Sequence, residues 1–167
     1  MEKFLEINPL LEAHIPEMMD IQKICFQEAY CESVFVYDTL VKVFPDGAWG
    51  AFYRDRMIGY IFFHPYKNQM VKPLDSGLVL TGDEDCMYLH EIAILPQYRA
   101  QGITGRLIDV FDKVSGQYRL NDQSLVSVQG SMEFWKKKGF ELVRRISEGG
   151  YEEGILMSKE IYYFQQG

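Results

Sequence analysis

A short basic loop past the middle of the chain contains the residues whose types and spacing could do chemistry. It follows the apolar run 92–95, turns at Pro96 and carries Arg99, Gly102 and Gly105 before a helical pattern begins. Small residues let the backbone N–H groups of such a loop converge on one point, and the positive end of the following helix favours an anion there. The spacing therefore predicts a cradle for the diphosphate of a nucleotide-like cofactor.

Two other kinds of phosphate loop do not fit these residues. A Walker loop has Lys and then Ser or Thr after its last glycine, whereas Gly105 is followed by Arg106 and Leu107. A dinucleotide fingerprint has three glycines early in a βαβ unit and an acidic residue about 20 positions later, whereas this loop has only Gly102 and Gly105.

The loop resembles the phosphate loop of the GNAT superfamily of acyl-CoA-dependent N-acyltransferases, whose pattern is Arg/Gln-x-x-Gly-x-Gly/Ala. At this place the chain reads Arg99-Ala100-Gln101-Gly102-Ile103-Thr104. The last position departs from the pattern because Thr104 carries a branched side chain, although Gly105 follows at once.

Residues 124–140 resemble the second hallmark of that superfamily, a strand and a short helix that ends Phe-Tyr-x-Lys-x-Gly-Phe. The chain reads Phe134-Trp135-Lys136-Lys137-Lys138-Gly139-Phe140. Trp135 in place of Tyr, together with Leu-His-Glu-Ile-Ala at 89–93, resembles a bacterial subgroup. Because the two motifs stand in the family's order and are separated by one helix, the chain is identified as a member of the superfamily.

The resemblance implies acetyl-CoA or coenzyme A as the co-substrate and no metal. It also implies that the pantetheine arm lies between two splayed strands and pairs with backbone groups, one of which supplies an oxyanion N–H. The cofactor-binding residues expected from the two motifs are Ile92, Ala93, Ile94, Arg99, Ala100, Gln101, Gly102, Ile103, Thr104, Gly105, Arg106, Phe134 and Trp135.

Three residues of the strand before the loop compete for the role of general base: Tyr88, His90 and Glu91. Amines of Lys-like basicity are protonated at neutral pH, so a base is useful. Tyr88 and His90 share one strand face, whereas Glu91 points to the other unless a bulge intervenes. We favour His90, because imidazole has an unperturbed pKa of about 6.5, with Glu91 second as base or as anchor for a cationic acceptor. A purely structural His–Glu pair stays open.

Length and composition limit the alternatives. The 167 residues suit one domain, spanning 1–167. The net charge of −7 argues against nucleic acid as a partner. No stretch approaches the roughly 18 apolar residues of a membrane span, so we expect a cytoplasmic protein without a membrane partner. Cys25, Cys31 and Cys86 show no metal-binding or disulfide spacing.

Hydrophobic periodicity predicts the α/β order β-α-α-β-β-β-α-β-α-β-β. We expect strands near 4–11, 48–54, 57–63, 87–95, 124–128, 142–145 and 153–159, and helices near 15–28, after 33, near 103–116 and after 131. A two-residue hairpin turn is predicted at Asp55-Arg56, and a long connection at 64–85. The resemblance implies a mixed, mostly antiparallel twisted sheet that is splayed at its middle and has helices on both faces.

Together these features predict an N-acetyltransferase that transfers the acetyl group of acetyl-CoA to a primary amine of a small molecule, by direct attack in a ternary complex. Two alternatives stay open. One is a non-catalytic acyl-CoA-binding regulatory module, because Thr104, Val128 and Trp135 depart from the family pattern. The other is an acetyltransferase of protein termini or lysines. Relatives in the superfamily commonly dimerise, which leaves a homodimer open.

Overall fold

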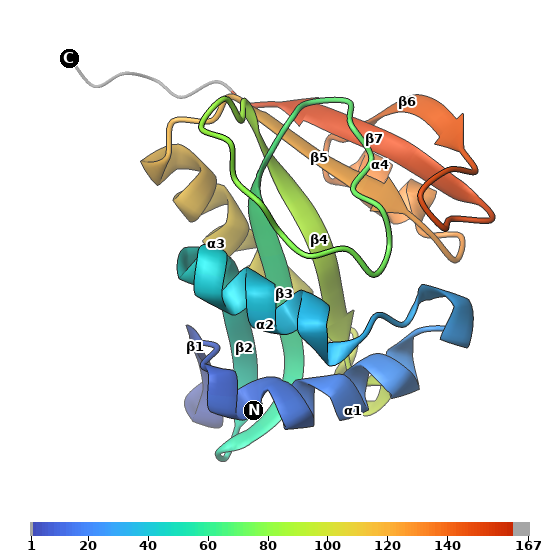
Figure 1. Cartoon of the computed structure of the whole chain (residues 1–167). Coiled ribbons are helices and arrows are strands. Elements are labelled where there is room, and N and C mark those ends of the chain that lie inside the picture. The colour runs from blue at the N-terminus through green and yellow to red at the C-terminus, as the bar shows by residue number, and fades with distance from the viewer. Residues whose placement is uncertain (1, 162–167) are drawn as a thin grey trace.

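One seven-stranded sheet organises the protein, which a computed structural model describes for residues 2–161 (Figure 1). The strands are β1 (Leu5–Pro9), β2 (Ala48–Tyr53), β3 (Arg56–Tyr66), β4 (Cys86–Ile94), β5 (Asp122–Ser127), β6 (Glu141–Ile146) and β7 (Gly154–Glu160). They lie in the order β1-β2-β3-β4-β5-β7-β6, and every neighbouring pair is antiparallel except β4 and β5. The predicted mixed and mostly antiparallel sheet is confirmed.

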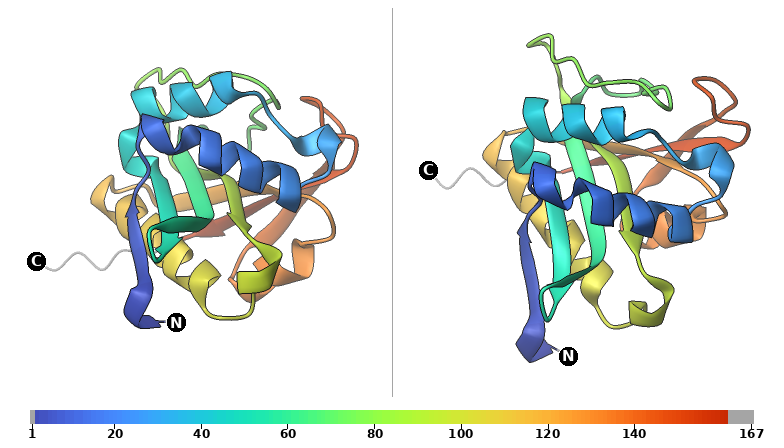
Figure 2. Two further views of the ribbon diagram at one scale, coloured as in Figure 1. Left: turned by 90° about the horizontal axis from the view of Figure 1, so that it is seen from below. Right: turned by 60° about the horizontal axis from the view of Figure 1, so that its bottom comes forward.

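Helices cover both faces of this sheet, as Figure 2 shows. They are α1 (Ile15–Cys25), α2 (Val34–Val43), α3 (Ile103–Gln117) and α4 (Met132–Lys137), in the predicted order. Side chains of a strand alternate between its faces. Phe62 of β3 therefore packs on Tyr37 of α2, with ring centroids 5.0 Å apart, whereas Phe63 packs on Phe111 of α3 at 5.1 Å.

The hairpin between β2 and β3 turns one residue earlier than predicted. Arg54 and Asp55 occupy the turn with φ angles of 50° and 65°, and Arg56 already pairs with Tyr53. Positive φ at both central residues is the geometry of a type I′ turn, whose twist matches that of the flanking strands. The aromatic runs located the hairpin but could not tell which two residues take this conformation.

Strands β4 and β5 separate after a short paired stretch. Cys86–Leu89 pairs with Asp122–Leu125, and β4 then continues to Ile94 while it pairs with β3 alone. Within the described chain, the β5-facing edge of residues 92–94 therefore has no strand partner. This opening is the splay expected at the middle of the sheet.

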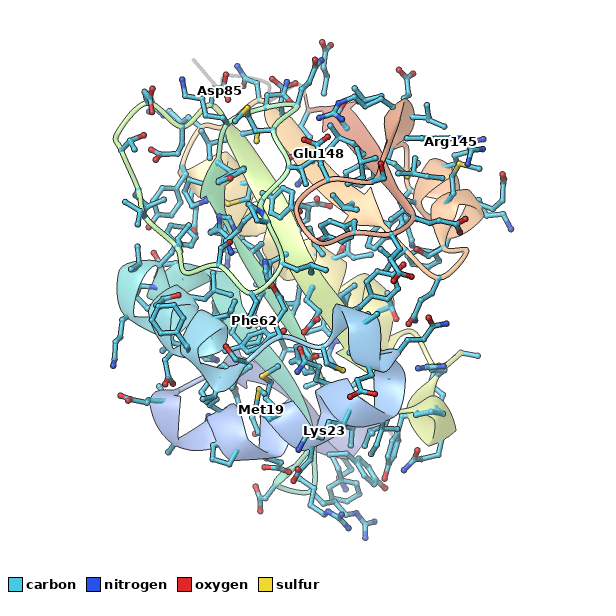
Figure 3. The ribbon with its side chains drawn as sticks, turned by 45° about the vertical axis from the view of Figure 1, so that its right-hand side comes forward. Met19, Lys23, Phe62, Asp85, Arg145 and Glu148 are labelled. Carbon is cyan, nitrogen blue, oxygen red and sulfur yellow. The ribbon has the colours of Figure 1, made fainter. Side chains whose placement is uncertain are left out.

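The long connection between β3 and β4 covers residues 67–85, because β3 runs three residues further than predicted. It passes close to α2, where the Leu78 N–H donates to Thr39 Oγ1 at 3.2 Å. It also meets the loop between β6 and β7, where the Leu74 N–H donates to the Gly149 carbonyl at 2.7 Å. Figure 3 shows this connection in front of the sheet and Phe62 in the interior. No helix among residues 2–161 is long and apolar enough to cross a membrane.

Candidate active site

A cavity of about 300 Å³ occupies the opening between β4 and β5. Its walls come from segments far apart in sequence, and each segment contributes a few side chains. They are Leu89–Ile94 of β4, Leu125 and Val126 of β5, Val128, Gln129 and Ser131 after it, Phe134 and Trp135 of α4, Arg99 and Thr104 of the loop before and the first turn of α3, Cys25, Phe26, Tyr30 and Glu32 at and after the end of α1, Leu74, and Tyr151.

The phosphate loop, residues 99–105, lies at the end of the cavity next to Ile94. Ala100 and Gly102 have φ angles of 61° and 80°, and Gly102 is the residue that directly precedes α3. A methyl group added to Gly102 or Gly105 would meet no atom within 4 Å, so the space in front of the helix is open. Because the first N–H groups of a helix have no partner within it, the residues present fit a diphosphate.

Side chains near this loop have distinct surroundings. The Nε of Arg99 donates to the Ile94 carbonyl at 3.0 Å, and the Cys25 thiol donates to the same oxygen at 3.4 Å. Arg99 is thus held against β4 while it lines the cavity. Arg106 is exposed and Ile103 is buried in the core, so only the first of these two can reach a ligand with its side chain.

The second motif forms an apolar wall of the cavity. Trp135 is buried, and its ring centroid lies 4.9 Å from that of Phe134 and 5.6 Å from that of Phe140. Phe134 is partly exposed at the cavity edge. The motif therefore places aromatic surface, and no acidic hydroxyl, beside the splayed strands.

A β-bulge in β4 brings His90 and Glu91 to one face of the sheet. Phe62 of β3 pairs with Glu91, and the next residue, Phe63, pairs with Leu89. His90, which lies between them in β4, is therefore the extra residue of the bulge. Glu91 Oε2 lies 2.8 Å from the hydroxyl of Tyr37, and the ring centroid of His90 lies 5.9 Å from that of Tyr37. Both residues also line the cavity.

His90 is held by Glu32, which the sequence analysis missed. The distance from His90 Nε2 to Glu32 Oε2 is 2.5 Å, and the two side chains are 4% and 3% exposed. Burial opposes ionisation of Glu32, but the charge and hydrogen bond of His90 outweigh it, so the pKa of Glu32 falls below its ordinary value. Facing an ionised carboxylate, Nε2 must carry a proton and donates it to Glu32.

Glu91 has the properties of a base that works near neutral pH. Burial raises its pKa to about 7, against the opposing effects of the His90 charge and a hydrogen bond from Tyr60. The Tyr60 hydroxyl donates to Oε2 at 2.6 Å, the oxygen that also faces Tyr37. Among residues 2–161 no hydrogen bond uses Oε1, so this oxygen is left for a ligand or water in the cavity that Glu91 lines.

Tyr88 lies one layer behind the cavity and does not line it. Its ring centroid is 5.4 Å from that of His64, and it interacts electrostatically with Tyr151, which does reach the cavity. Burial raises the pKa of Tyr88 well above its ordinary value. Tyr88 can therefore act on a ligand only through another residue.

Sequence reasoning missed the partners of His90 and Glu91 because no local spacing marks them. Glu32 is separated from His90 by 58 positions, Tyr37 from Glu91 by 54 and Tyr60 from Glu91 by 31. The three cysteines are free, and no group of three or more His, Cys, Asp or Glu side chains within residues 2–161 could hold a metal ion.

The splayed sheet and the open helix start beside the gap are the features expected of the acyltransferase fold that the two motifs indicated. Residues 15–140 match the acetyltransferase (GNAT) family, and the chain belongs to this family. No curated protein matches the chain.

Solved structures with the same fold extend this result. The loading GNATL domain of CurA from Lyngbya majuscula is 14% identical, with 94% of this chain and 98% of that one covered and a TM-score of 0.79. The GphF GNAT-like decarboxylase in complex with isobutyryl-CoA is 12% identical, with coverage of 94% and 100% and a TM-score of 0.76. Naa50 from Arabidopsis thaliana, in complex with the bisubstrate analogue CoA-Ac-MVNAL, is 16% identical, with coverage of 95% and 99% and a TM-score of 0.68. At these identities the likeness is one of fold.

Proposed function

We propose that this family member transfers an acetyl group from acetyl-CoA to a primary amine of a small molecule, by direct attack in a ternary complex. The observation that carries the proposal is the continuity of one cavity, which joins Arg99 and Thr104 at the phosphate loop to Glu91 in the middle of β4. Such a cavity would let one elongated ligand reach from an anion cradle at the loop to a base on β4.

The donor side of the site follows from the walls of the cavity. The open first turn of α3 after Gly102 would hold the diphosphate, and the unpaired edge of β4 at residues 92–94 would bond to the pantetheine arm. Phe134 and Trp135 would cover that arm with apolar surface. Acetyl-CoA would supply the thioester carbonyl that an amine attacks, and two of the related structures contain CoA-derived ligands.

Glu91 is the better candidate for the base than His90, which the sequence favoured. Its pKa of about 7 lets it accept a proton at physiological pH. His90 is instead engaged by Glu32 through Nε2 and acts as a positioning residue that supplies positive charge beside Glu91.

The proton balance of the transfer follows from these roles. The amine nitrogen bonds to the carbonyl carbon, its proton passes to the carboxylate of Glu91, and the bond between carbon and sulfur breaks. Because the indole of Trp135 is not an acid, water protonates the departing thiolate, whose pKa is roughly 8.5 by analogy with cysteine.

A second cavity favours a second candidate, a peptide or protein N-terminus as the acceptor. This cavity of about 530 Å³ lies between Gln27 of the connection after α1 and Glu153 of the β6–β7 loop. It shares Tyr30, Val128 and Gln129 with the first cavity, so a long acceptor could extend from one into the other.

The test combines binding and turnover on one sample. Calorimetric titration with acetyl-CoA and with free CoA measures the cradle, and release of free thiol is then followed against small amines and short peptides with free N-termini. Release with small amines supports the proposal, and release with peptides alone selects the second candidate. Binding without any release indicates a non-catalytic regulatory module, and absence of binding contradicts the assignment of the cradle.

A matched pair of variants assigns the base. Glu91→Gln should keep CoA binding and lose turnover, whereas Glu141→Gln, which changes an exposed carboxylate of β6, should keep both.

A further inference from the structure

The hydroxyl of Tyr37 faces more acceptors than it has protons. Tyr37 is fully buried in α2, and its Oη contacts Gln22 Oε1, lies 2.8 Å from Glu91 Oε2 and lies 3.3 Å from Glu32 Oε2. A phenol donates one hydrogen bond. Only one of these three acceptors can receive it at a time, and the other contacts need a different proton.

Gln22 of α1 is fixed as an acceptor toward Tyr37. Its Nε2 donates to the Glu32 carbonyl at 3.1 Å, and its Oε1 accepts from the Glu32 N–H at 3.2 Å, so its amide cannot be flipped without loss of both bonds. Gln22 is 1% exposed, which removes water as an alternative partner. The proton between Gln22 Oε1 and Tyr37 Oη must therefore come from Tyr37.

The contact between Tyr37 and Glu91 then requires its own proton. With the Tyr37 proton directed to Gln22, Glu91 must donate from Oε2 to Tyr37 Oη, while Oε2 still accepts from Tyr60 at 2.6 Å. The arrangement of hydrogen bonds is thus that of a neutral Glu91. When Glu91 ionises, the Tyr37 proton must turn away from Gln22 and toward the carboxylate.

The charged and titratable groups around Glu91 come from every element packed against it. They are Tyr37 of α2, Tyr60 of β3, His90 of β4, Cys25 of α1, Glu32 and Cys31 of the connection after α1, and Tyr151 of the β6–β7 loop, with His64 and Lys72 one step further away beside His90 and Glu32. Of these groups in the described residues 2–161, Tyr37 is the one that joins Glu91 to a fixed acceptor, Gln22 of α1.

We infer that Gln22 and Tyr37 are positioning residues that favour the protonated form of Glu91 after it has taken a proton, by rotation of one hydroxyl between Gln22 and Glu91. No net transfer out of Tyr37 is needed: the proton taken from the amine stays on Glu91, and the Tyr37 proton returns to Gln22. Glu91 then releases its proton to water in the cavity before the next cycle. The consequence for turnover rests on the proposed function, whereas the protonation of Glu91 can be measured without any acyl transfer.

The experiment is a double-mutant cycle read by infrared spectroscopy. The C=O stretch of protonated Glu91, identified in the difference spectrum against Glu91→Gln, is titrated with pH in the wild type, Gln22→Met, Tyr37→Phe and the double variant. Gln22→Met frees the Tyr37 proton for the carboxylate, so the midpoint should fall by about one pH unit. In the Tyr37→Phe background the Gln22 substitution should no longer move the midpoint.

Tyr60→Phe is the matched control, because Tyr60 donates to the same oxygen of Glu91 and, in the part of the chain that the structure describes, makes no hydrogen bond to Gln22. It should raise the midpoint, and the shift caused by Gln22→Met should persist in its presence. A Gln22→Met shift that survives in the Tyr37→Phe background, or a midpoint that stays or rises in Gln22→Met alone, would overturn the inference.

A second measurement needs no substitution at Gln22. The Raman doublet of tyrosine reports whether a hydroxyl donates or accepts, and the Tyr37 contribution is obtained by difference against Tyr37→Phe. It should change with pH at the Glu91 midpoint and stay constant in Glu91→Gln; a contribution independent of pH in the wild type overturns the inference. Failure to find an acceptor amine would leave these spectra unaffected, so the two hypotheses fail separately.

Discussion

The burial of Glu91 has a measurable effect on the stability of the whole protein. Its pKa lies at about 7 against an ordinary 4.5, and one pKa unit corresponds to about 1.4 kcal/mol. Ionising this carboxyl in the folded protein therefore costs about 3 kcal/mol more than in the unfolded chain. The group is 8% exposed, so little of this cost is screened by solvent.

The sign of the effect follows from the raised pKa. Below pH 4.5 the carboxyl is protonated in both states and the cost is absent. Between pH 4.5 and 7 the unfolded chain loses the proton first, so the free energy of unfolding falls as pH rises. Above pH 7 the full cost is present. Glu91→Gln, whose amide oxygen can still accept from Tyr37 and Tyr60, should remove it.

Urea denaturation of the wild type and Glu91→Gln at several pH values between 4.5 and 8 measures this difference. The difference in unfolding free energy between Glu91→Gln and the wild type should be about 3 kcal/mol more favourable to the variant at pH 8 than at pH 4.5. Glu141→Gln, at an exposed position, should give a difference that does not depend on pH. If the gap between wild type and Glu91→Gln is the same at both ends of the range, Glu91 is not a carboxyl with a raised pKa and the reasoning fails.

Three further outcomes test the site and the fold. Glu91→Gln should lower kcat by roughly 10²- to 10⁴-fold with little change in the Kd of CoA. Steady-state kinetics measures the first quantity and calorimetry the second, and a loss of CoA binding would contradict the role of Glu91 as a base. Gly102→Ala places a Cβ on a residue whose φ is 80°, which costs about 1–2 kcal/mol of backbone strain. Calorimetry should therefore show weaker CoA binding, and an unchanged affinity would argue against this cradle. Gly47→Ala would place Cβ 1.8 Å from the carbonyl oxygen of Phe63, so circular dichroism should show loss of the folded protein, and a native-like melt would contradict the backbone packing described for this turn.

Local signals explain why much of the fold could be predicted from the sequence. The element order follows from hydrophobic periodicity, and the position of the loop before the helix that begins at Ile103 follows from glycine spacing. These properties depend on residues a few positions apart. The two motifs at 99–104 and 134–140 also suffice for the family, which the match over residues 15–140 confirms.

Register and long-range contact explain what the sequence left open. A period of two places His90 and Glu91 on opposite faces, and only the pairing of β3 with β4 shows the bulge that reverses this. The choice between the two bases then depends on Glu32, which engages His90, and on Tyr37 and Tyr60, which surround Glu91. A pKa is determined by burial and by the charges within a few ångströms. The amino-acid sequence alone therefore indicated the strand on which we propose the base, and the tertiary structure supplied the contacts that favour Glu91 over His90.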